Sequence, residues 1–103
     1  MFDSIKNLFS AEKTDYAALV KNGAVIVDVR SKGEYAGGHI KNSVNIPVDQ
    51  LTANLSRLKD KNKAIITCCA SGMRSSSAQN ILKNAGYTEV YNGGGWMGLN
   101  NKI

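Results

Sequence analysis

Two short runs of apolar, mostly β-branched residues constrain the fold of this chain more than any other feature. They cover Ala24–Val29 and Ala64–Cys68. Nearly continuous runs of this length are typical of strands that are buried on both faces of a parallel sheet. Val44–Ile46 and Glu89–Tyr91 predict two further strands. Because segments with helical spacing separate the strands, we expect an α/β fold with a mostly parallel central sheet and helices on both faces.

The helical segments carry recognisable start and stop signals. Thr14 is a suitable N-cap for a helix over Asp15–Asn22, which Gly23 ends. A helical turn is expected over Ser31–Ala36, and a short tail after Gly93–Gly95. Helical spacing also occurs at Phe2, Ile5, Leu8 and Phe9, at Leu51, Leu55 and Leu58, and, in a helix starting near Ser75, at Ala78, Ile81, Leu82 and Ala85.

Size and composition predict one globular domain spanning residues 1–103. The chain is 43% hydrophobic and 20% charged, which is ordinary for a globular protein and excludes disordered and collagen-like classes. The longest apolar run, Tyr16–Val20, is far shorter than the about 20 residues of a membrane-spanning helix. Met1–Phe9 lacks the apolar core of a secretory signal. We therefore expect no membrane association and a cytoplasmic location.

The formal net charge is +5, which suits an anionic small molecule or an acidic partner. Basic residues are spread along the chain, and their densest run, Lys59, Lys61 and Lys63, is broken by Asp60. Such a run is typical of a solvated turn. No nucleic-acid partner is expected.

The chain has two cysteines, and they are adjacent. Cys68 and Cys69 cannot link distant segments, and with a single histidine they do not make a zinc-site spacing. Two interpretations remain open at this point. The thiols are either inert core residues or include a reactive nucleophile.

Cys69 is the better placed thiol for chemistry, because it follows a predicted strand and precedes a helix. Ligands of parallel sheets bind outside the carboxyl ends of the strands. Backbone N–H groups of the loop Ala70–Arg74 and the nearby helix N-terminus would favour an anion and lower the pKa of a thiol. Gly72 permits the tight turn, and Arg74 would add a positive charge or clamp the loop. From spacing alone, a buried Cys69 with a solvent-facing Arg74 remains an alternative.

Several separated segments make the chain resemble the single-domain rhodaneses, in the same order and over roughly residues 14–96. The matching segments are Val27–Arg30, Glu34-Tyr35 with Gly38–Ile40, Asn42–Pro47, Cys69–Ser75, and Gly86-Tyr87 with Val90 and Gly94-Gly95. This resemblance implies a three-layer rhodanese-like fold. It also implies a sulfurtransferase that carries sulfane sulfur as a cysteine persulfide.

Carried over residue by residue, the resemblance makes Cys69 the catalytic nucleophile. It makes Ala70, Ser71, Gly72, Met73 and Arg74 the substrate-binding loop, which cradles the persulfide through backbone amides. The implied donor is a small anionic sulfur compound such as thiosulfate, a polysulfide or a persulfide. The implied acceptor is a thiol, cyanide or a cysteine of an acceptor protein. No metal or organic cofactor is implied.

Two other functions stay open. One is a non-enzymatic persulfide carrier or docking module, fast only with a protein partner. The other is a Cys-based phosphatase or arsenate reductase, since related α/β folds hold an anion in a cysteine loop. The segment between Cys69 and Arg74 is one residue shorter than in protein tyrosine phosphatases. No Asp or Glu follows it until Glu89, whereas phosphoryl transfer needs a general acid for the leaving alcohol.

Other conspicuous residues are better explained by structural roles. Cys68 ends a predicted strand as a small buried hydrophobe, with an accessory redox role as the alternative. For His39 we expect a hydrogen-bonded framework role, with a Cys/His catalytic pair as the alternative. For Arg30 and Glu34 we expect an ion pair that shapes the rim of the site, with a contact to substrate as the alternative. Packing roles at the core or rim are expected for Trp96 and Met97.

Overall fold

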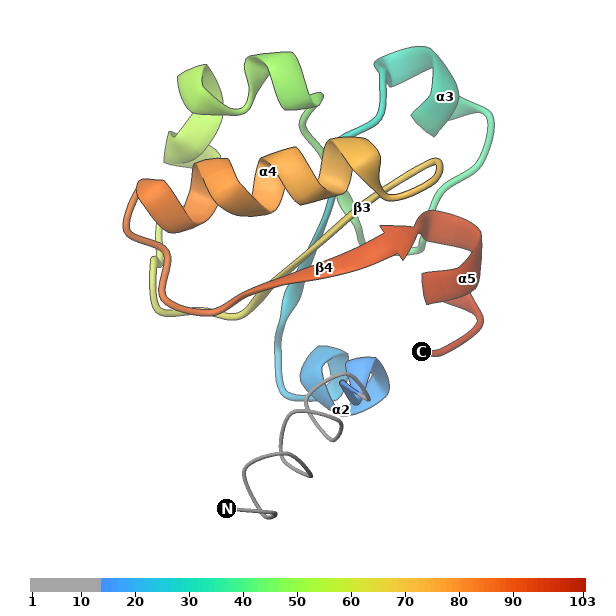
Figure 1. The fold of residues 1–103 in the computed structure, drawn as a ribbon. Helices are drawn as coiled ribbons and strands as arrows, with labels where there is room; N and C mark the ends of the chain where they lie inside the picture. Colours follow the sequence, from blue (N-terminus) through green and yellow to red (C-terminus); the bar gives the residue numbers. More distant parts are fainter. Residues whose placement is uncertain (1–13) are drawn as a thin grey trace, which may run out of the picture.

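The computed structural model describes residues 14–103, so the helix expected at Phe2–Phe9 lies outside the described residues. A four-stranded sheet has the order β2-β1-β3-β4, and every neighbouring pair is parallel (Figure 1). The strands are β1 (Val25–Asp28), β2 (Val44–Asn45), β3 (Ile65–Cys69) and β4 (Val90–Gly95). The predicted parallel α/β fold is confirmed.

Helices cover both faces of this sheet. They are α2 (Tyr16–Lys21), α3 (Lys32–Ala36), α4 (Met73–Asn84) and α5 (Trp96–Asn100), with the 3₁₀-helices η1 (Val48–Gln50) and η2 (Thr52–Arg57). One core lies between the sheet, α4 and the 3₁₀-helices, and a second lies between the sheet, α2 and α5. Figure 1 shows α4 and α2 on opposite sides of the strands. Within residues 14–103, no helix is long and apolar enough to span a membrane.

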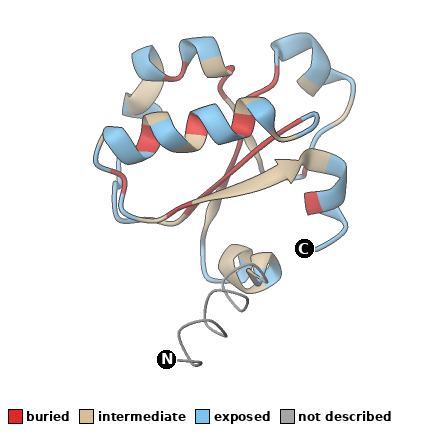
Figure 2. Cartoon of the chain, in the orientation of Figure 1, coloured by how far each residue is buried: buried red, intermediate tan, exposed pale blue. Residues whose placement is uncertain are grey.

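Alternate residues of β3 enter different cores, because successive side chains of a strand point to opposite faces. Ile65 and Cys69 belong to the core under α4, whereas Ile66 and Cys68 belong to the core against α2 and α5. All five β3 residues are buried (Figure 2). The two adjacent cysteines therefore face opposite layers of the molecule.

The outer edge of β4 is covered by side chains. The carbonyl of Val90 accepts a hydrogen bond from the Gln79 amide, and the carbonyl of Asn92 accepts one from the Tyr16 hydroxyl, both at 3.0 Å. An uncovered edge strand invites pairing with another chain. These two bonds satisfy backbone groups that would otherwise be free for such pairing.

Two helices start at residues other than those predicted. The carboxylate of Asp15, not Thr14, caps α2 by accepting a hydrogen bond from the Ala18 amide at 3.0 Å. Helix α4 starts at Met73, before Ser75, because Gly72 adopts a left-handed conformation and turns the chain directly into the helix. Met73 and Arg74 therefore lie in the first turn of α4, not in a loop.

Two 3₁₀-helices replace the amphipathic α-helix expected over the spaced leucines. The Asn54 amide bonds the carbonyl of Leu51, and the Leu58 amide bonds that of Leu55, so the hydrogen bonds span three residues. The Asn54 side chain donates to the Gln50 carbonyl at 2.7 Å, and such local side-chain bonds compete with the α-helix. Leu51 and Leu58 are still buried, so the apolar pattern predicted burial correctly but not the type of helix.

The three consecutive glycines form the end of β4, and helix α5 follows them where a short tail was expected. A Cβ on Gly93 would lie 2.9 Å from side-chain atoms of Ile66 and Leu99, and one on Gly95 would lie 2.9 Å from the Ala70 carbonyl oxygen. Close approach of backbones explains glycine here better than flexibility does. It brings β4 directly against the segment that follows Cys69.

We expect Gly95→Ala to lower the free energy of unfolding by about 1–3 kcal/mol, because the added methyl group overpacks a backbone contact. Gly98→Ala is the matched control, since Gly98 lies in α5 with open space around its Cβ position and alanine favours helix. Urea denaturation of both variants measures the difference. Equal unfolding midpoints would contradict the close-approach explanation.

Candidate active site

Cys69 lies at the carboxyl end of β3, the position where parallel sheets bind ligands. It is the last residue of the strand, one residue further than predicted, because it pairs with Gly95 of β4 beyond a register shift. Its exposed fraction is only 1%. The chain then passes through Ala70–Gly72 directly into α4.

Backbone amides surround the thiol of Cys69. The Gly72 N–H donates to Sγ at 2.9 Å, and the Ser75 N–H donates to it at 3.3 Å. Gly72 has φ of 107°, and this left-handed conformation turns the chain into α4, whose first turn directs the Ser75 N–H to the sulfur. Together these amides form a cup around the Cys69 sulfur. A glycine turn and the first turn of α4 build this cup.

These donors decide the ionisation of Cys69. Burial alone would raise the pKa of the thiol. The hydrogen bond with the Ser75 side chain and the bonds from the amides of Ser75, Gly72 and Ser71 act in the opposite direction and hold the pKa below its ordinary value. The arrangement favours a thiolate, which is the nucleophilic form.

Cys68 has the opposite chemistry. It is fully buried against the second core, and burial, assisted by the nearby Asp28, raises its pKa to about 12. A thiol in such a setting stays protonated and inert. These observations agree with the interpretation of Cys68 as a small buried hydrophobe.

Arg74 clamps α4 to α3. Its guanidinium makes two bonds to the Glu34 carboxylate, at 2.7 and 3.0 Å. The hydrogen bonds from Arg74 and from the Ser31 amide lower the pKa of Glu34 to about 2. Arg74 thus joins two helices, and its role in substrate binding stays a prediction.

The prediction of an ion pair between Arg30 and Glu34 is wrong. Arg30 pairs with the carboxylate of Asp28 at 2.7 Å, and both side chains are buried. It also donates to the Gly38 carbonyl at 2.7 Å and lies 4.6 Å over the Trp96 ring. Asp28 lies two residues before Arg30 on the same face of the extended chain, and this spacing places its carboxylate beside the guanidinium.

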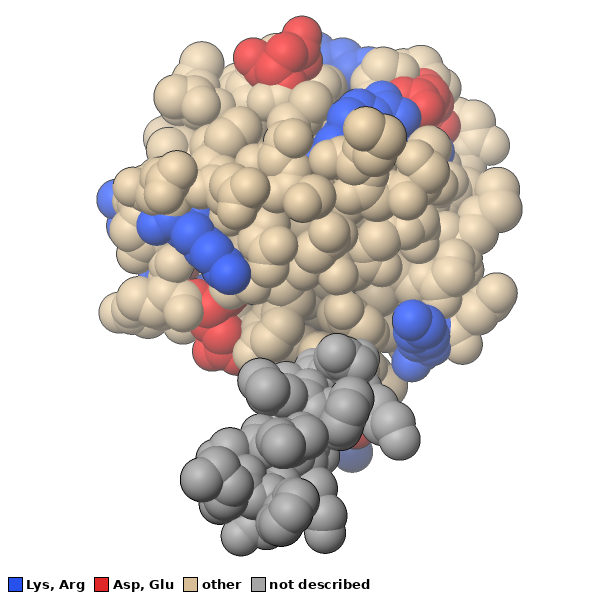
Figure 3. Space-filling view, in the orientation of Figure 1, with Lys and Arg blue, Asp and Glu red and all other residues tan. Residues whose placement is uncertain are grey.

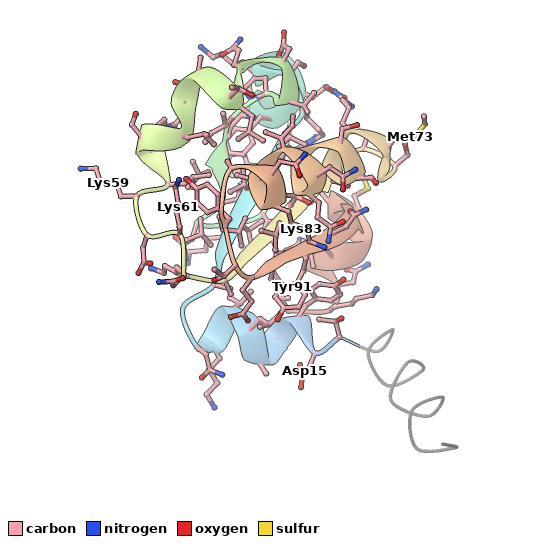
Figure 4. All side chains as sticks on the ribbon, turned by 60° about the vertical axis from the view of Figure 1, so that its left-hand side comes forward. Asp15, Lys59, Lys61, Met73, Lys83 and Tyr91 are labelled. Carbon is pink, nitrogen blue, oxygen red and sulfur yellow. The ribbon has the colours of Figure 1, made fainter. Side chains whose placement is uncertain are left out.

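The remaining residues that the sequence singled out lie around the Cys69 site. Met73 is 80% exposed, and Figure 4 shows its side chain pointing away from the molecule at the start of α4. Met97 is also exposed, whereas Trp96 packs on the second core. The Nδ1 atom of His39 lies 2.8 Å from the Tyr35 carbonyl oxygen, and its ring stacks on Tyr35, as a framework role requires.

Ser75 and Asn92 contact the site, although the sequence predicted neither. The Ser75 hydroxyl is buried, 3.5 Å from Cys69 Sγ and 2.6 Å from Asn92 Oδ1. By residue type Ser75 is an ordinary helix-start residue, and its further signal is its place at the end of the segment Cys69–Ser75 that resembles the rhodaneses. Asn92 precedes the glycine run and carried no signal.

A groove of about 460 Å³ lies beside the clamp. Its lining includes Ser31 and Lys32 before and in α3, Asp49 of η1, and Arg74. Cys69 does not line the groove. On the face shown in Figure 3, which looks onto α4 and β4, basic side chains stand apart from one another and most of the surface is uncharged.

The fold and the cysteine cup define a small α/β protein of the rhodanese type. The family model described as "Rhodanese-like domain" matches residues 12–102. The chain therefore belongs to the rhodanese-like family.

Individual relatives agree with this assignment. The protein named thiosulfate sulfurtransferase PspE from Escherichia coli (strain K12) is 34% identical over 70 residues, which cover 67% of this chain and 67% of that protein. The tRNA sulfurtransferase of Thermoplasma acidophilum is 32% identical over 89 residues, covering 84% of this chain but 18% of the relative. A solved structure titled "rhodanese with anions from E. coli" has a TM-score of 0.70 at 31% identity, covering 74% of this chain and 91% of that one.

Proposed function

We propose that this protein is a sulfurtransferase that moves sulfane sulfur from thiosulfate, a polysulfide or a persulfide to a thiophilic acceptor. The observation that carries the proposal is the buried Cys69 thiol, which receives amide hydrogen bonds at the end of a parallel strand. Similarity to proteins named sulfurtransferase supports it. Free, unpaired Cys68 and Cys69 also fit a reducing compartment, so we place the reaction in the cytoplasm.

The reaction has two half-steps through one covalent intermediate. The Cys69 thiolate attacks the outer sulfur of the donor, a new S–S bond forms, and the bond to the leaving group breaks. With thiosulfate the leaving group is sulfite, which keeps the bonding electron pair. A thiol, cyanide or a cysteine of an acceptor protein then attacks the outer sulfur, and Cys69 leaves as thiolate. Two half-reactions of this kind predict ping-pong kinetics.

The surrounding residues have supporting roles in this proposal. Amides of Ser71, Gly72 and Ser75 stabilise negative charge on the thiolate and on the persulfide. The segment that follows Cys69 also includes Ala70 before the glycine turn, and Met73 and Arg74 in the first turn of α4. The Arg74–Glu34 clamp holds this first turn against α3. The groove beside Arg74, with Lys32 in its wall, offers an anionic donor a place next to the turn.

A persulfide carrier is the second candidate. The 1% exposure of Cys69 favours it, because a thiol this enclosed needs a fitted partner to reach it. The carrier would accept sulfur from small donors slowly and react quickly with a protein cysteine. Steady-state turnover with thiosulfate and cyanide separates the two candidates.

Intact-mass measurement after incubation with thiosulfate or polysulfide tests the proposal. We expect a gain of one sulfur atom that cyanide removes and that Cys69→Ser does not acquire. Aryl phosphate serves as the competing substrate, and we expect no hydrolysis of it. Efficient Cys69-dependent phosphate release, with no sulfur adduct from any donor, would reject sulfur transfer in favour of a phosphatase.

A further inference from the structure

The hydroxyl of Ser75 has one proton and lies within hydrogen-bond distance of two oxygen acceptors and of the Cys69 sulfur, which accepts a hydrogen bond as the thiolate. Asn92 Oδ1 lies at 2.6 Å, the Gly72 carbonyl oxygen at 3.0 Å and Cys69 Sγ at 3.5 Å. Ser75 is fully buried, so solvent does not supply a substitute donor. A hydroxyl donates only one hydrogen bond at a time. The acceptors therefore compete for it.

Asn92 is held so that its oxygen faces Ser75. The Gly94 N–H donates to the same Oδ1 atom at 2.9 Å, which identifies that atom as the oxygen of the amide. The Asn92 carbonyl accepts the Tyr16 hydroxyl at 3.0 Å, so backbone and side chain are both anchored. Asn92 thus presents a fixed acceptor to Ser75.

The two protonation states of Cys69 use this hydroxyl differently. In the thiol, S–H donates to Ser75 Oγ while the Ser75 hydroxyl donates to Asn92, so every group is satisfied. When the thiol releases its proton to water, the hydroxyl must leave Asn92 before it can donate to the thiolate. Asn92 therefore favours the thiol form, in opposition to the amides of the cup.

We propose that Asn92 is a positioning residue that, through the Ser75 hydroxyl, sets the fraction of Cys69 present as thiolate. This inference rests on the proposed role of Cys69 as the nucleophile. A thiolate that is stabilised too strongly attacks sulfur poorly, because nucleophilicity falls with pKa and is best near ambient pH. By opposing the amides, Asn92 limits how far the cup lowers the pKa of Cys69, and so it preserves the nucleophilicity of the sulfur.

Other charged and titratable groups around Cys69 remain unchanged when Asn92 is replaced. Arg74 of α4, neutralised by Glu34 of α3, interacts with the Cys69 charge. On the other side, Cys68 lies between Cys69 and the Asp28–Arg30 pair. A change of the titration on replacing Asn92 with leucine therefore reports the Ser75 hydrogen bond, whereas Asn92→Asp also adds a charge that raises the pKa of Cys69 directly.

Two variants that we expect to shift the pH midpoint of Cys69 alkylation in opposite directions test the inference. The rate of alkylation by iodoacetamide is measured against pH in a Cys68→Ala background, so that only Cys69 reacts. We expect Asn92→Leu, which has nearly the same size but no acceptor, to shift the Cys69 midpoint down by about one pH unit. Asn92→Asp is expected to shift it up by about as much, because a carboxylate holds the Ser75 proton more strongly. A merely structural disturbance would move both variants in the same direction.

Ser75→Ala provides the double-mutant cycle. In that background we expect Asn92→Leu to leave the midpoint unchanged and Asn92→Asp to keep only the part of its upward shift that the carboxylate charge causes directly. Asn92→Asp keeps the oxygen that Gly94 binds, so a smaller shift in this arm decides the question even if the leucine variant does not fold. A leucine shift that persists, or an aspartate shift of unchanged size, without the Ser75 hydroxyl would overturn the inference. Because alkylation needs no sulfur donor, normal shifts without any sulfur adduct would reject the proposed function instead.

Discussion

Cys69→Ser is expected to reduce sulfur transfer to the uncatalysed background, whereas Cys68→Ser retains most of the activity. The physical reason is the different setting of the two thiols. Cys69 receives amide hydrogen bonds in the cup, and Cys68 is enclosed in the opposite core with a pKa of about 12. A serine hydroxyl does not form a persulfide and ionises far less readily than a thiol. Transfer of sulfur from thiosulfate to cyanide measures both variants.

The two substitutions are chemically identical, so each controls for the other. Cys68→Ala serves as a second control, because a buried hydroxyl at position 68 has a desolvation cost. Circular dichroism verifies that each variant folds. If a folded Cys68 variant were inactive while Cys69→Ser transferred sulfur, the assignment of the nucleophile would be wrong.

Arg30→Ala is expected to cost about 3–5 kcal/mol of unfolding free energy, because it leaves the Asp28 carboxylate buried without a partner. The side chains of this pair are only 5% and 0% exposed. The substitution also removes the bond to the Gly38 carbonyl and the contact with Trp96. Urea denaturation measures the loss.

Arg74→Ala is the matched control, because it breaks an ion pair of the same type at the surface. The Arg74 and Glu34 side chains are 37% and 38% exposed, and solvent screens exposed pairs, so we expect only a small loss. Arg30→Lys keeps the charge but loses the paired geometry, and we expect an intermediate loss. If Arg30→Ala and Arg74→Ala lowered the free energy of unfolding by similar amounts, burial would not be what makes the Asp28–Arg30 pair important for stability.

Local patterns in the sequence were sufficient for the architecture, and together with the family resemblance they predicted Cys69 as the nucleophile. The apolar runs predicted buried parallel strands, and the period of two along β3 separates Cys68 from Cys69. The glycine that turns the chain after Cys69 was also visible in the sequence. These features depend on residues that are close neighbours along the chain, so spacing is enough to identify them.

Only the tertiary structure decided which distant groups meet. The Glu34 partner of Arg74, the Asn92 partner of Ser75 and the contact of Gly95 with Ala70 each join separate elements. Parallel pairing of β4 with β3 places the end of β4 beside the cup. Polar side chains choose partners by distance and burial after the strands have paired. Residue type and spacing along the chain therefore predicted where the two thiols lie, whereas strand pairing determined which side chains surround Cys69.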